Sequence, residues 1–261
     1  QFKIICLLFI MNSSCLCKEN IQLTSEIKQR YPKEIEKSIT NTVKYDDVRT
    51  LETKGVPLQD SANISVIYED TVDAGFYLKK EGYNPLILNM ASNTTPGGGW
   101  RKGATAQEES LFYRSLYYLA LEDRGFYPLS IYSAIYTPDV FFFRSKQLDG
   151  YGILPYEECE FLSCVAIPAL RKPKLTNGKY GKQPRKVMKE KIRGIFKIAL
   201  EHKHDSLVLG AFGNGAFQNP PHDVAEIFNE VISEYKNYFR KIQKADRRNV
   251  YLIYICATLS F

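Results

Sequence analysis

Two adjacent glutamates, Glu108 and Glu109, follow a glycine triplet at residues 97–99 and are the residues best suited by type to do chemistry. Glycine lets the backbone approach a ligand closely and adopt positive φ at no steric cost. Apolar residues follow the glutamates at helical spacing, so the pair lies at a helix N-terminus, where free N–H groups favour anions. The pattern predicts a site at which carboxylate chemistry acts on a phosphate- or sugar-containing ligand.

The two glutamates are expected to differ in their roles. Thr105 and Glu108 have the spacing of a capping box, in which Glu108 holds the backbone of Thr105. Glu109 has no such structural role. Adjacent helical residues point about 100° apart, so the pair cannot flank one bond from opposite faces as the two carboxylates of most glycosidases do. We expect at most one of them over a reacting centre, with its neighbour holding a hydroxyl or the helix end.

Strands and helices that alternate along the chain are expected to position this pair. Apolar and alternating runs predict strands at 64–68, 85–88, 131–136, 140–143, 162–167, 207–209 and 250–256, with a turn at 137–139. Helical spacing predicts short helices within 18–45 and further helices at 71–80, 105–120, 192–199 and 224–239, while 171–191 is expected to be a solvated basic loop. This order is typical of an α/β sandwich with a parallel or mixed sheet.

A second glycine-rich loop, residues 210–217, follows the predicted strand at 207–209. Ligands of open α/β sheets bind at the carboxyl ends of the strands, and both glycine loops leave strands at that end. Two such loops would form a cleft lined with backbone N–H groups, which suits a diphosphate. Neither loop ends in Gly-Lys-Ser/Thr, so a P-loop of the kind found in nucleoside triphosphatases is excluded. The second loop lacks the third glycine of the dinucleotide-binding fingerprint, so a Rossmann-type dinucleotide site is excluded as well.

Other classes of site have little support. His202, His204 and His222 are expected in surface or capping roles, and neither the histidines nor the six cysteines have the spacing of a metal site, so no metal and no cofactor are expected. Cys159, Cys164 and Cys256 lie in apolar runs and are expected as buried free thiols. The basic segment 171–191 lacks interleaved aromatic residues, so we expect no direct DNA or RNA binding.

The bulk composition fits one globular domain with an extension. The 261 residues carry 35 basic and 29 acidic side chains, a formal charge of +6 that mildly favours anionic partners. Lys3 and the apolar residues 4–11 resemble a signal peptide, but the run is too short to cross a bilayer as a helix. We expect a cytoplasmic or nuclear protein, or a secreted one if residues 1–17 are a signal peptide, with no stable membrane association and a monomeric state.

These motifs together resemble one known family. Gly97-Gly98-Gly99 with Gln107-Glu108-Glu109 looks like the signature of poly(ADP-ribose) glycohydrolases, and the fuller pattern from Leu88 to Leu111 is similar to the microbial, bacterial-type branch. The second glycine loop with Asn219-Pro220 resembles the diphosphate loop of that branch, and residues 136–140 match a further segment. The resemblance covers roughly residues 42–257. It implies residues 1–41 as an N-terminal extension and 42–261 as a macrodomain-like three-layer α/β/α domain with a mixed sheet.

The resemblance also implies an activity and a set of site residues. The family hydrolyses ribose–ribose O-glycosidic bonds in poly(ADP-ribose) and releases ADP-ribose. By this carry-over Glu109 is the catalytic acid, which protonates the leaving ribosyl oxygen and then activates water, while Glu108 binds ribose hydroxyls. The implied ligand-binding residues are Asn89 or Asn93 at the ribose, Gly97, Gly98, Gly99 and Gln107 in the first motif, and Gly210, Ala211, Phe212, Gly213, Asn214, Gly215, Ala216 and Phe217 around the diphosphate.

Departures from the family pattern affect ligand contacts rather than the acid. Phe212 and Asn214 stand where the diphosphate loop commonly has Trp and Cys, and Ala166-Ile167-Pro168-Ala169 stands where a strand often ends in Ala-Pro-Asn. The expected partners are poly(ADP-ribose), ADP-ribose and ADP-ribosylated proteins. Two alternatives stay open: a hydrolase of mono-ADP-ribosyl groups or another ADP-ribose derivative, and a non-catalytic reader of ADP-ribose. An intact Gln107-Glu108-Glu109 favours the enzyme, because a reader does not need it.

Overall fold

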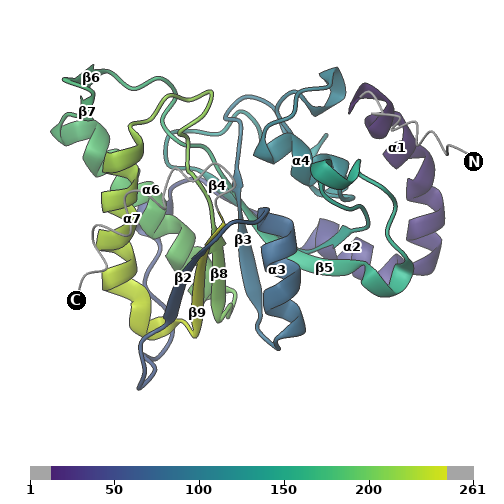
Figure 1. Cartoon of the computed structure of the whole chain (residues 1–261), viewed down its shortest axis with the longest axis horizontal. Coiled ribbons are helices and arrows are strands. Elements are labelled where there is room, and N and C mark those ends of the chain that lie inside the picture. Colours follow the sequence, from purple (N-terminus) through teal and green to yellow (C-terminus); the bar gives the residue numbers. More distant parts are fainter. Residues whose placement is uncertain (1–12, 246–261) are drawn as a thin grey trace, which may run out of the picture.

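The structure is a computed structural model that describes residues 13–245. A mixed sheet of seven strands lies at its centre, in the order β1-β4-β5-β3-β8-β9-β2 (Figure 1). The strands are β1 (Val43–Tyr45), β2 (Asn63–Ile67), β3 (Pro85–Met90), β4 (Ala134–Phe142), β5 (Glu160–Ile167), β8 (Ser206–Leu209) and β9 (Lys241–Ala245). Strands β5, β3, β8, β9 and β2 run parallel, while β4 is antiparallel to both β5 and β1.

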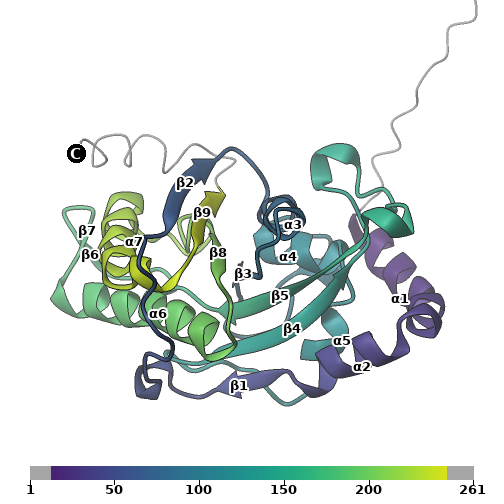
Figure 2. The same ribbon diagram turned by 90° about the horizontal axis from the view of Figure 1, so that it is seen from below.

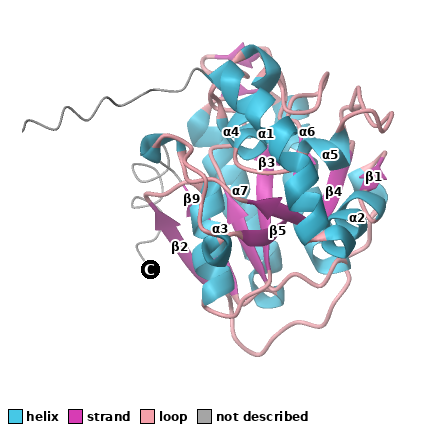
Figure 3. Ribbon diagram, turned by 90° about the vertical axis from the view of Figure 1, so that its right-hand side faces the viewer, coloured by secondary structure: helices cyan, strands magenta, loops and turns pink. Residues whose placement is uncertain are grey.

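Helices cover both faces of this sheet, which confirms the predicted three-layer α/β/α arrangement (Figures 2 and 3). They are α1 (Ser13–Arg30), α2 (Pro32–Thr40), α3 (Thr71–Lys80), α4 (Gln107–Tyr113), α5 (Tyr118–Leu121), α6 (Lys182–Glu201) and α7 (Pro221–Tyr235). Short 3-10 helices lie at Val48–Thr50, Trp100–Lys102, Gln147–Asp149, Tyr156–Glu158 and Lys236–Tyr238.

Strand alternation divides the core into two apolar clusters, one on each face. Leu86 and Leu88 of β3 pack with α6 and α7, whereas Ile87 points to the opposite cluster, which contains residues of α1 to α5. This follows from the period of two in a strand, whose successive side chains point to opposite faces. Both faces of β3 are therefore buried, which fixes the loop that leaves its carboxyl end.

The two glycine loops follow neighbouring strands of the sheet. The first loop leaves β3 and the second leaves β8, and these strands pair in parallel. Their carboxyl ends therefore meet at the same edge, as the sequence predicts. The strands expected at 64–68, 85–88, 162–167 and 207–209 and the helix expected at 71–80 are confirmed as β2, β3, β5, β8 and α3.

The helix predicted over 105–120 is in fact two short helices, α4 and α5. The break falls at residues 114–117, where Leu116 N–H donates to Phe141 O in β4 at 3.0 Å. The fully buried guanidinium of Arg114 pairs with Asp70 and Asp73 instead of turning to solvent. Tertiary pairing thus ends the helix where the apolar spacing alone would continue it.

The predicted turn at 137–139 is wrong, because these residues form a bulge inside one strand. β4 runs from Ala134 to Phe142, and its register with β5 shifts between Thr137 and Val140. Asp139 has a φ of 46° and absorbs the irregularity. A bulge inserts an extra residue without ending the pairing, so Pro138 is tolerated there.

The basic segment 171–191 is more ordered than predicted. It contains a hairpin of β6 (Leu175–Thr176) and β7 (Lys179–Tyr180), and α6 begins at Lys182, ten residues before the predicted helix. Pro184 lies in the first turn of α6, where a missing N–H breaks no helical hydrogen bond. Strands β1 and β9 were not predicted, and the strand predicted at 250–256 lies outside the described residues.

The N-terminal helices pack on the helices around the glycine triplet. Leu16 and Cys17 of α1 and Ile35 of α2 belong to the same apolar cluster as Phe112 of α4. Cys164 is buried and free as predicted, whereas Cys159 is only partly buried. Within residues 13–245, no helix has the length and apolarity needed to cross a membrane.

Candidate active site

A cavity of about 490 Å³ lies where the two glycine loops meet the start of α4. Of the predicted site residues, it is lined by Gly98, Gln107, Glu108, Glu109, Ala211, Gly213, Asn214, Gly215, Ala216 and Phe217. Six predicted residues lie outside the lining: Asn89, Asn93, Gly97, Gly99, Gly210 and Phe212. The other lining residues were not predicted from the sequence: Glu69, Asp70, Thr71, Met90, Ser92, Thr105, Ala106, Ser110, Gln147, Ala169 and Ala245.

Glu108 is held from the β3 side by three N–H donors. Its oxygens accept from the backbone of Ser92 at 2.6 Å, from the backbone of Gly97 at 3.2 Å and from the Asn89 amide at 3.5 Å. Only 4% of the residue is exposed. Glu108 therefore ties the first turn of α4 to the end of β3 and to the glycine triplet, rather than to Thr105 as the sequence predicts.

Glu109, not Glu108, makes the capping contact of α4. Ala106 is the N-cap residue, and its N–H donates to Glu109 Oε2 at 3.1 Å. Glu109 Oε1 accepts from Gly99 N–H at 2.8 Å. The predicted capping box was thus shifted by one residue, and the expectation that Glu109 has no structural role is wrong. A carboxylate has about four lone-pair sites, so two donors leave Glu109 more free acceptor capacity than three leave Glu108.

The glycine triplet has no room for side chains. Gly97 and Gly98 have positive φ values of 68° and 56°. A Cβ on Gly97 would lie 2.5 Å from the Phe112 ring, and a Cβ on Gly98 would lie 2.5 Å from Glu109 Oε1. The backbone therefore passes directly against both the helix core and the carboxyl group, which only glycine permits.

Gly98→Ala is expected to remove most activity, because the new methyl group displaces the Glu109 carboxyl, and to destabilise the fold by about 1–3 kcal/mol. Gly125 is a matched control, since its φ is +67° and a Cβ there meets nothing within 4 Å. Turnover and Tm of both alanine variants should be compared. Equal loss of turnover in both would mean that contact with Glu109 is not the cause.

Neither candidate asparagine lines the cavity. Asn89 is fully buried, and its amide lies 3.5 Å from Glu108 Oε1. The carbonyl of Asn93 accepts from Leu129 N–H at 2.8 Å. Ser92, which lies between them in sequence, lines the cavity instead and donates its N–H to Glu108. Asn89 thus contacts the cavity-lining Glu108 rather than the cavity itself.

Gln107 is held at both ends of its amide by the protein. Its Nε2 donates to Leu88 O at 2.8 Å and to Thr71 Oγ1 at 3.1 Å, and its Oε1 accepts from Met90 N–H at 3.0 Å. The side chain therefore bridges α4 to β3 and to α3. This fixes the direction in which the following two glutamates leave the helix.

Free backbone N–H groups line the second glycine loop. Asn219 Nδ2 donates to Gly213 O at 3.0 Å and to Leu170 O at 2.7 Å, which holds the loop in shape. Within residues 13–245, the backbone N–H groups of five cavity-lining residues of this loop have no acceptor: Ala211, Gly213, Gly215, Ala216 and Phe217. Both side-chain polar atoms of Asn214 are also buried without a partner. Unpaired donors of this kind form an anion-binding concavity.

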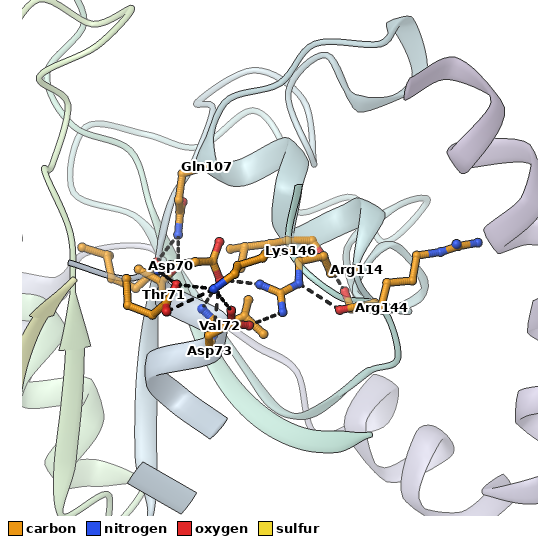
Figure 4. A network of polar contacts seen from close by, with 12 residues as sticks. Asp70, Thr71, Val72, Asp73, Gln107, Arg114, Arg144 and Lys146 are labelled. Carbon is orange, nitrogen blue, oxygen red and sulfur yellow. Dashed lines mark hydrogen bonds and ion pairs between the residues drawn. The ribbon is translucent and has the colours of Figure 1, made fainter. Parts of the chain in front are cut away.

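An ion-pair network joins the start of α3, the end of α4 and the segment after β4 (Figure 4). Arg114 at the end of α4 pairs with Asp70 and Asp73 at the start of α3. Lys146 pairs with Glu69 at 3.0 Å and with Asp73 at 3.3 Å. The network brings Glu69, Asp70 and Gln147 to the cavity. Glu69 and Asp70 follow β2, so the rule that ligands bind at strand carboxyl ends could have found them, whereas nothing in the sequence links Gln147 to the site.

Burial raises the pKa of Glu108 to about 8, against the opposing effect of the N–H donated by Ser92. Between pH 4.5 and 8 the folded chain keeps this proton while the unfolded chain loses it, so the contribution to the free energy of unfolding falls as the pH rises through this window. We expect Tm of the unmodified chain to fall relative to Glu108→Gln from pH 5 to pH 8. Parallel Tm profiles would contradict the raised pKa.

The histidines lie outside the cavity. His202 stacks on the Tyr136 ring at 3.5 Å and hydrogen-bonds Tyr45, while burial lowers the pKa of His204 to about 4. His222 lies within 4.8 Å of Asp223 and Glu226 as a possible ligand trio. Asp223 accepts from Tyr180 N–H and Glu226 pairs with Arg185, so both carboxylates already have protein partners.

A known protein family matches the N-terminal part of the chain. The family described as microbial-type PARG, catalytic domain, matches residues 13–145, which is more than half of the 261 residues. No curated protein sequence matches significantly.

Solved structures of the same type share the fold. Poly(ADP-ribose) glycohydrolase from Thermomonospora curvata, bound to the inhibitor ADP-HPD, is 24% identical with a TM-score of 0.78, over 94% of this chain and 98% of that one. The enzyme from Deinococcus radiodurans in complex with ADP-ribose is 26% identical with a TM-score of 0.68, over 84% and 92%. The match over residues 13–145 shows that the chain belongs to the microbial-type poly(ADP-ribose) glycohydrolase family, the PARG glycosidases.

Proposed function

We propose that the chain hydrolyses ribose–ribose O-glycosidic bonds of poly(ADP-ribose) in this cavity and releases ADP-ribose. The observation that carries the proposal is the pairing of two carboxyls, Glu108 and Glu109, with a facing loop of free N–H groups in one cavity. The carboxyls suit a ribose and its glycosidic bond, and the N–H groups suit a diphosphate. ADP-ribose contains both groups at a short covalent separation.

The diphosphate binds at the loop 210–217 under this proposal. The backbone N–H groups of Gly213, Gly215, Ala216 and Phe217 donate to its oxygens, and the Asn214 amide adds a further donor. Phe217 is partly exposed in the cavity and packs against the ribose. Gly210 and Phe212 do not line the cavity, so they support the loop without contacting the diphosphate. Phe212 is fully buried in the core.

Glu109 is the general acid and base. Its carboxyl group donates a proton to the ribosyl oxygen of the leaving unit as the bond from that oxygen to the anomeric carbon breaks. The carboxylate then takes a proton from water, whose oxygen bonds to the oxocarbenium-like carbon. This completes one hydrolysis and restores the protonated acid. The hydrogen bonds from Gly99 and Ala106 fix its two oxygens during both steps.

Glu108 orients the ribose beside this acid. It lines the cavity, and its three donors fix its position relative to the glycine triplet. Because burial raises its pKa to about 8, Glu108 keeps its proton at neutral pH. A neutral Glu108 donates to a ribose hydroxyl and adds no negative charge beside Glu109.

Two alternatives use the same cavity: removal of mono-ADP-ribosyl groups from modified proteins, and binding of ADP-ribose without turnover. The test supplies equal amounts of ADP-ribose as polymer and as single groups on a protein, and separates released ADP-ribose by chromatography. We expect release from the polymer. Release from the single groups alone would favour the first alternative, and binding with no release from either would favour the second.

A further inference from the structure

One segment of the chain beside the cavity carries charged side chains of a single sign. Residues 161–189 contain no Asp or Glu and eight basic side chains, namely Arg171, Lys172, Lys174, Lys179, Lys182, Arg185, Lys186 and Lys189. This exceeds the formal charge of +6 of the whole chain. The cavity lining does not include any of these side chains, so the hydrolysis at Glu109 leaves them without a role.

Among residues 13–245, six of these eight basic side chains form no ion pair. Arg185 and Lys189 pair with glutamates of α7, including Glu230. Arg171, Lys172, Lys174, Lys179, Lys182 and Lys186 are exposed, and in the part of the chain that the structure describes they form no ion pair with a carboxylate. A cluster of like charges without counter-charges concentrates anions at its surface.

Residues 171–186, called the basic surface below, are hydrogen-bonded to the loop 210–217 and to Asn219, which follows it. Lys172 N–H donates to Phe217 O at 2.8 Å. Tyr180 of β7 donates its hydroxyl to Asn219 Oδ1 at 2.6 Å, and Asn219 in turn donates to Leu170 O. Figure 1 shows the β6–β7 hairpin at the upper left, beside α6 and α7. The basic surface is therefore continuous with one wall of the cavity.

We propose that this basic surface binds the diphosphates of polymer units that lie next to the unit held in the cavity. The proposal rests on the proposed function. A cavity of about 490 Å³ has the size of a site for one ADP-ribose unit. The rest of a poly(ADP-ribose) chain therefore lies outside it. Each outer unit carries a diphosphate, and Lys172, which is hydrogen-bonded through its backbone to Phe217, places the cations of residues 171–174 beside the cavity.

RNA fits the surface less well than this polymer. Single strands are held by aromatic rings that stack on bases, together with positive charge. The one aromatic residue in 171–186, Tyr180, is buried and its hydroxyl is bound to Asn219. Diphosphate binding needs only the cations, which the surface supplies.

The test uses the Glu109→Gln variant, so that the polymer is not cleaved during binding. A triple variant, Lys172→Gln with Lys174→Gln and Lys179→Gln, removes three charges from the surface. A control triple, Lys28→Gln with Lys33→Gln and Lys80→Gln, removes three exposed and unpaired charges from α1, α2 and α3 on the other face of the sheet. Both triples have the same net charge. The Kd is measured for long poly(ADP-ribose) and for ADP-ribose at several salt concentrations.

We expect the surface triple to weaken binding of the long polymer roughly tenfold at low salt and to make the slope of log Kd against log salt shallower by about 2. ADP-ribose binding should not change, and the control triple should match its parent. Equal weakening by both triples, equal loss for ADP-ribose, or competition by poly(A) as strong as by unlabelled polymer would each overturn the proposal.

Failure of the proposed function gives a different result. The unmodified chain could release no ADP-ribose while the surface triple still weakens polymer binding selectively. In that case the proposed hydrolysis is wrong and the proposed binding of polymer by the basic surface is supported. If the unmodified chain releases ADP-ribose and the surface triple binds polymer like its parent, the basic surface alone is wrong.

Discussion

Glu109→Gln is expected to reduce release of ADP-ribose from poly(ADP-ribose) by roughly 10²–10⁴-fold, the usual contribution of a positioned acid–base group. An amide cannot transfer the proton that the leaving ribosyl oxygen needs. The side chain keeps its shape, and the diphosphate loop is untouched. Affinity for ADP-ribose, measured by calorimetry, should therefore stay within roughly a factor of ten of the unmodified chain, or about 1.4 kcal/mol.

The neighbouring glutamate provides the contrast. Glu108→Gln should weaken ADP-ribose binding and lower turnover less than Glu109→Gln, because Glu108 orients ribose and transfers no proton. Tm of both variants should be measured alongside, since each glutamate accepts backbone N–H groups in the fold. A greater loss of turnover in Glu108→Gln than in Glu109→Gln, at equal Tm, would mean that Glu108 is the acid–base group and Glu109 orients the ribose.

Arg114→Met is expected to give the largest loss of stability, about 3–5 kcal/mol in the free energy of unfolding. Arg114 is fully buried and pairs with Asp70 and Asp73, so its removal leaves two partly buried carboxylates without their main partner. Asp70 also caps α3 by accepting from Val72 N–H at 2.9 Å. The start of α3, which lines the cavity at Asp70 and Thr71, should loosen together with the end of α4.

Arg240→Met is the matched control. Arg240 pairs with Asp205 at 2.9 Å, but half of its side chain is exposed. Exposed ion pairs contribute at most about 1 kcal/mol, so this variant should unfold close to the unmodified chain in urea. Similar losses in the two variants would mean that burial of the Arg114 network adds nothing to stability.

The strands that were predicted from the sequence are those with plain apolar runs. β3 and β8 are buried on both faces, so nearly every residue is apolar and the pattern is unmistakable. β9 reads Lys-Ile-Gln-Lys-Ala and was missed. Lys244 is almost fully buried there and donates to Asn229 Oδ1, so tertiary partners offset a polar sequence that no local pattern marks as a strand.

The site was predicted at the level of loops, but not at the level of hydrogen bonds. The sequence places Thr105 in the position that a capping side chain favours, yet α4 starts one residue later, after Ala106. The carboxylate of Glu109 replaces the missing cap by accepting from both Ala106 and Gly99. That arrangement depends on the path of the glycine triplet, which a helix pattern does not contain.

The wall formed by Glu69, Asp70 and Gln147 depends on contacts between segments far apart in the chain. Lys146 reaches Glu69 only because the chain after β4 folds back over α3. Arg114 reaches Asp70 across 44 residues. Local spacing predicts the elements that carry these residues, but the pairing of charges between elements appears only once the sheet order is known.

The most direct test of the account is a crystal structure of the Glu109→Gln variant with a dimer of ADP-ribose units bound. We predict that the glycosidic oxygen lies about 3 Å from the side-chain amide at position 109, and that one diphosphate lies against the N–H groups of Gly213, Gly215 and Ala216. A glycosidic oxygen next to Glu108 instead, or a diphosphate away from the loop 210–217, would contradict the mechanism.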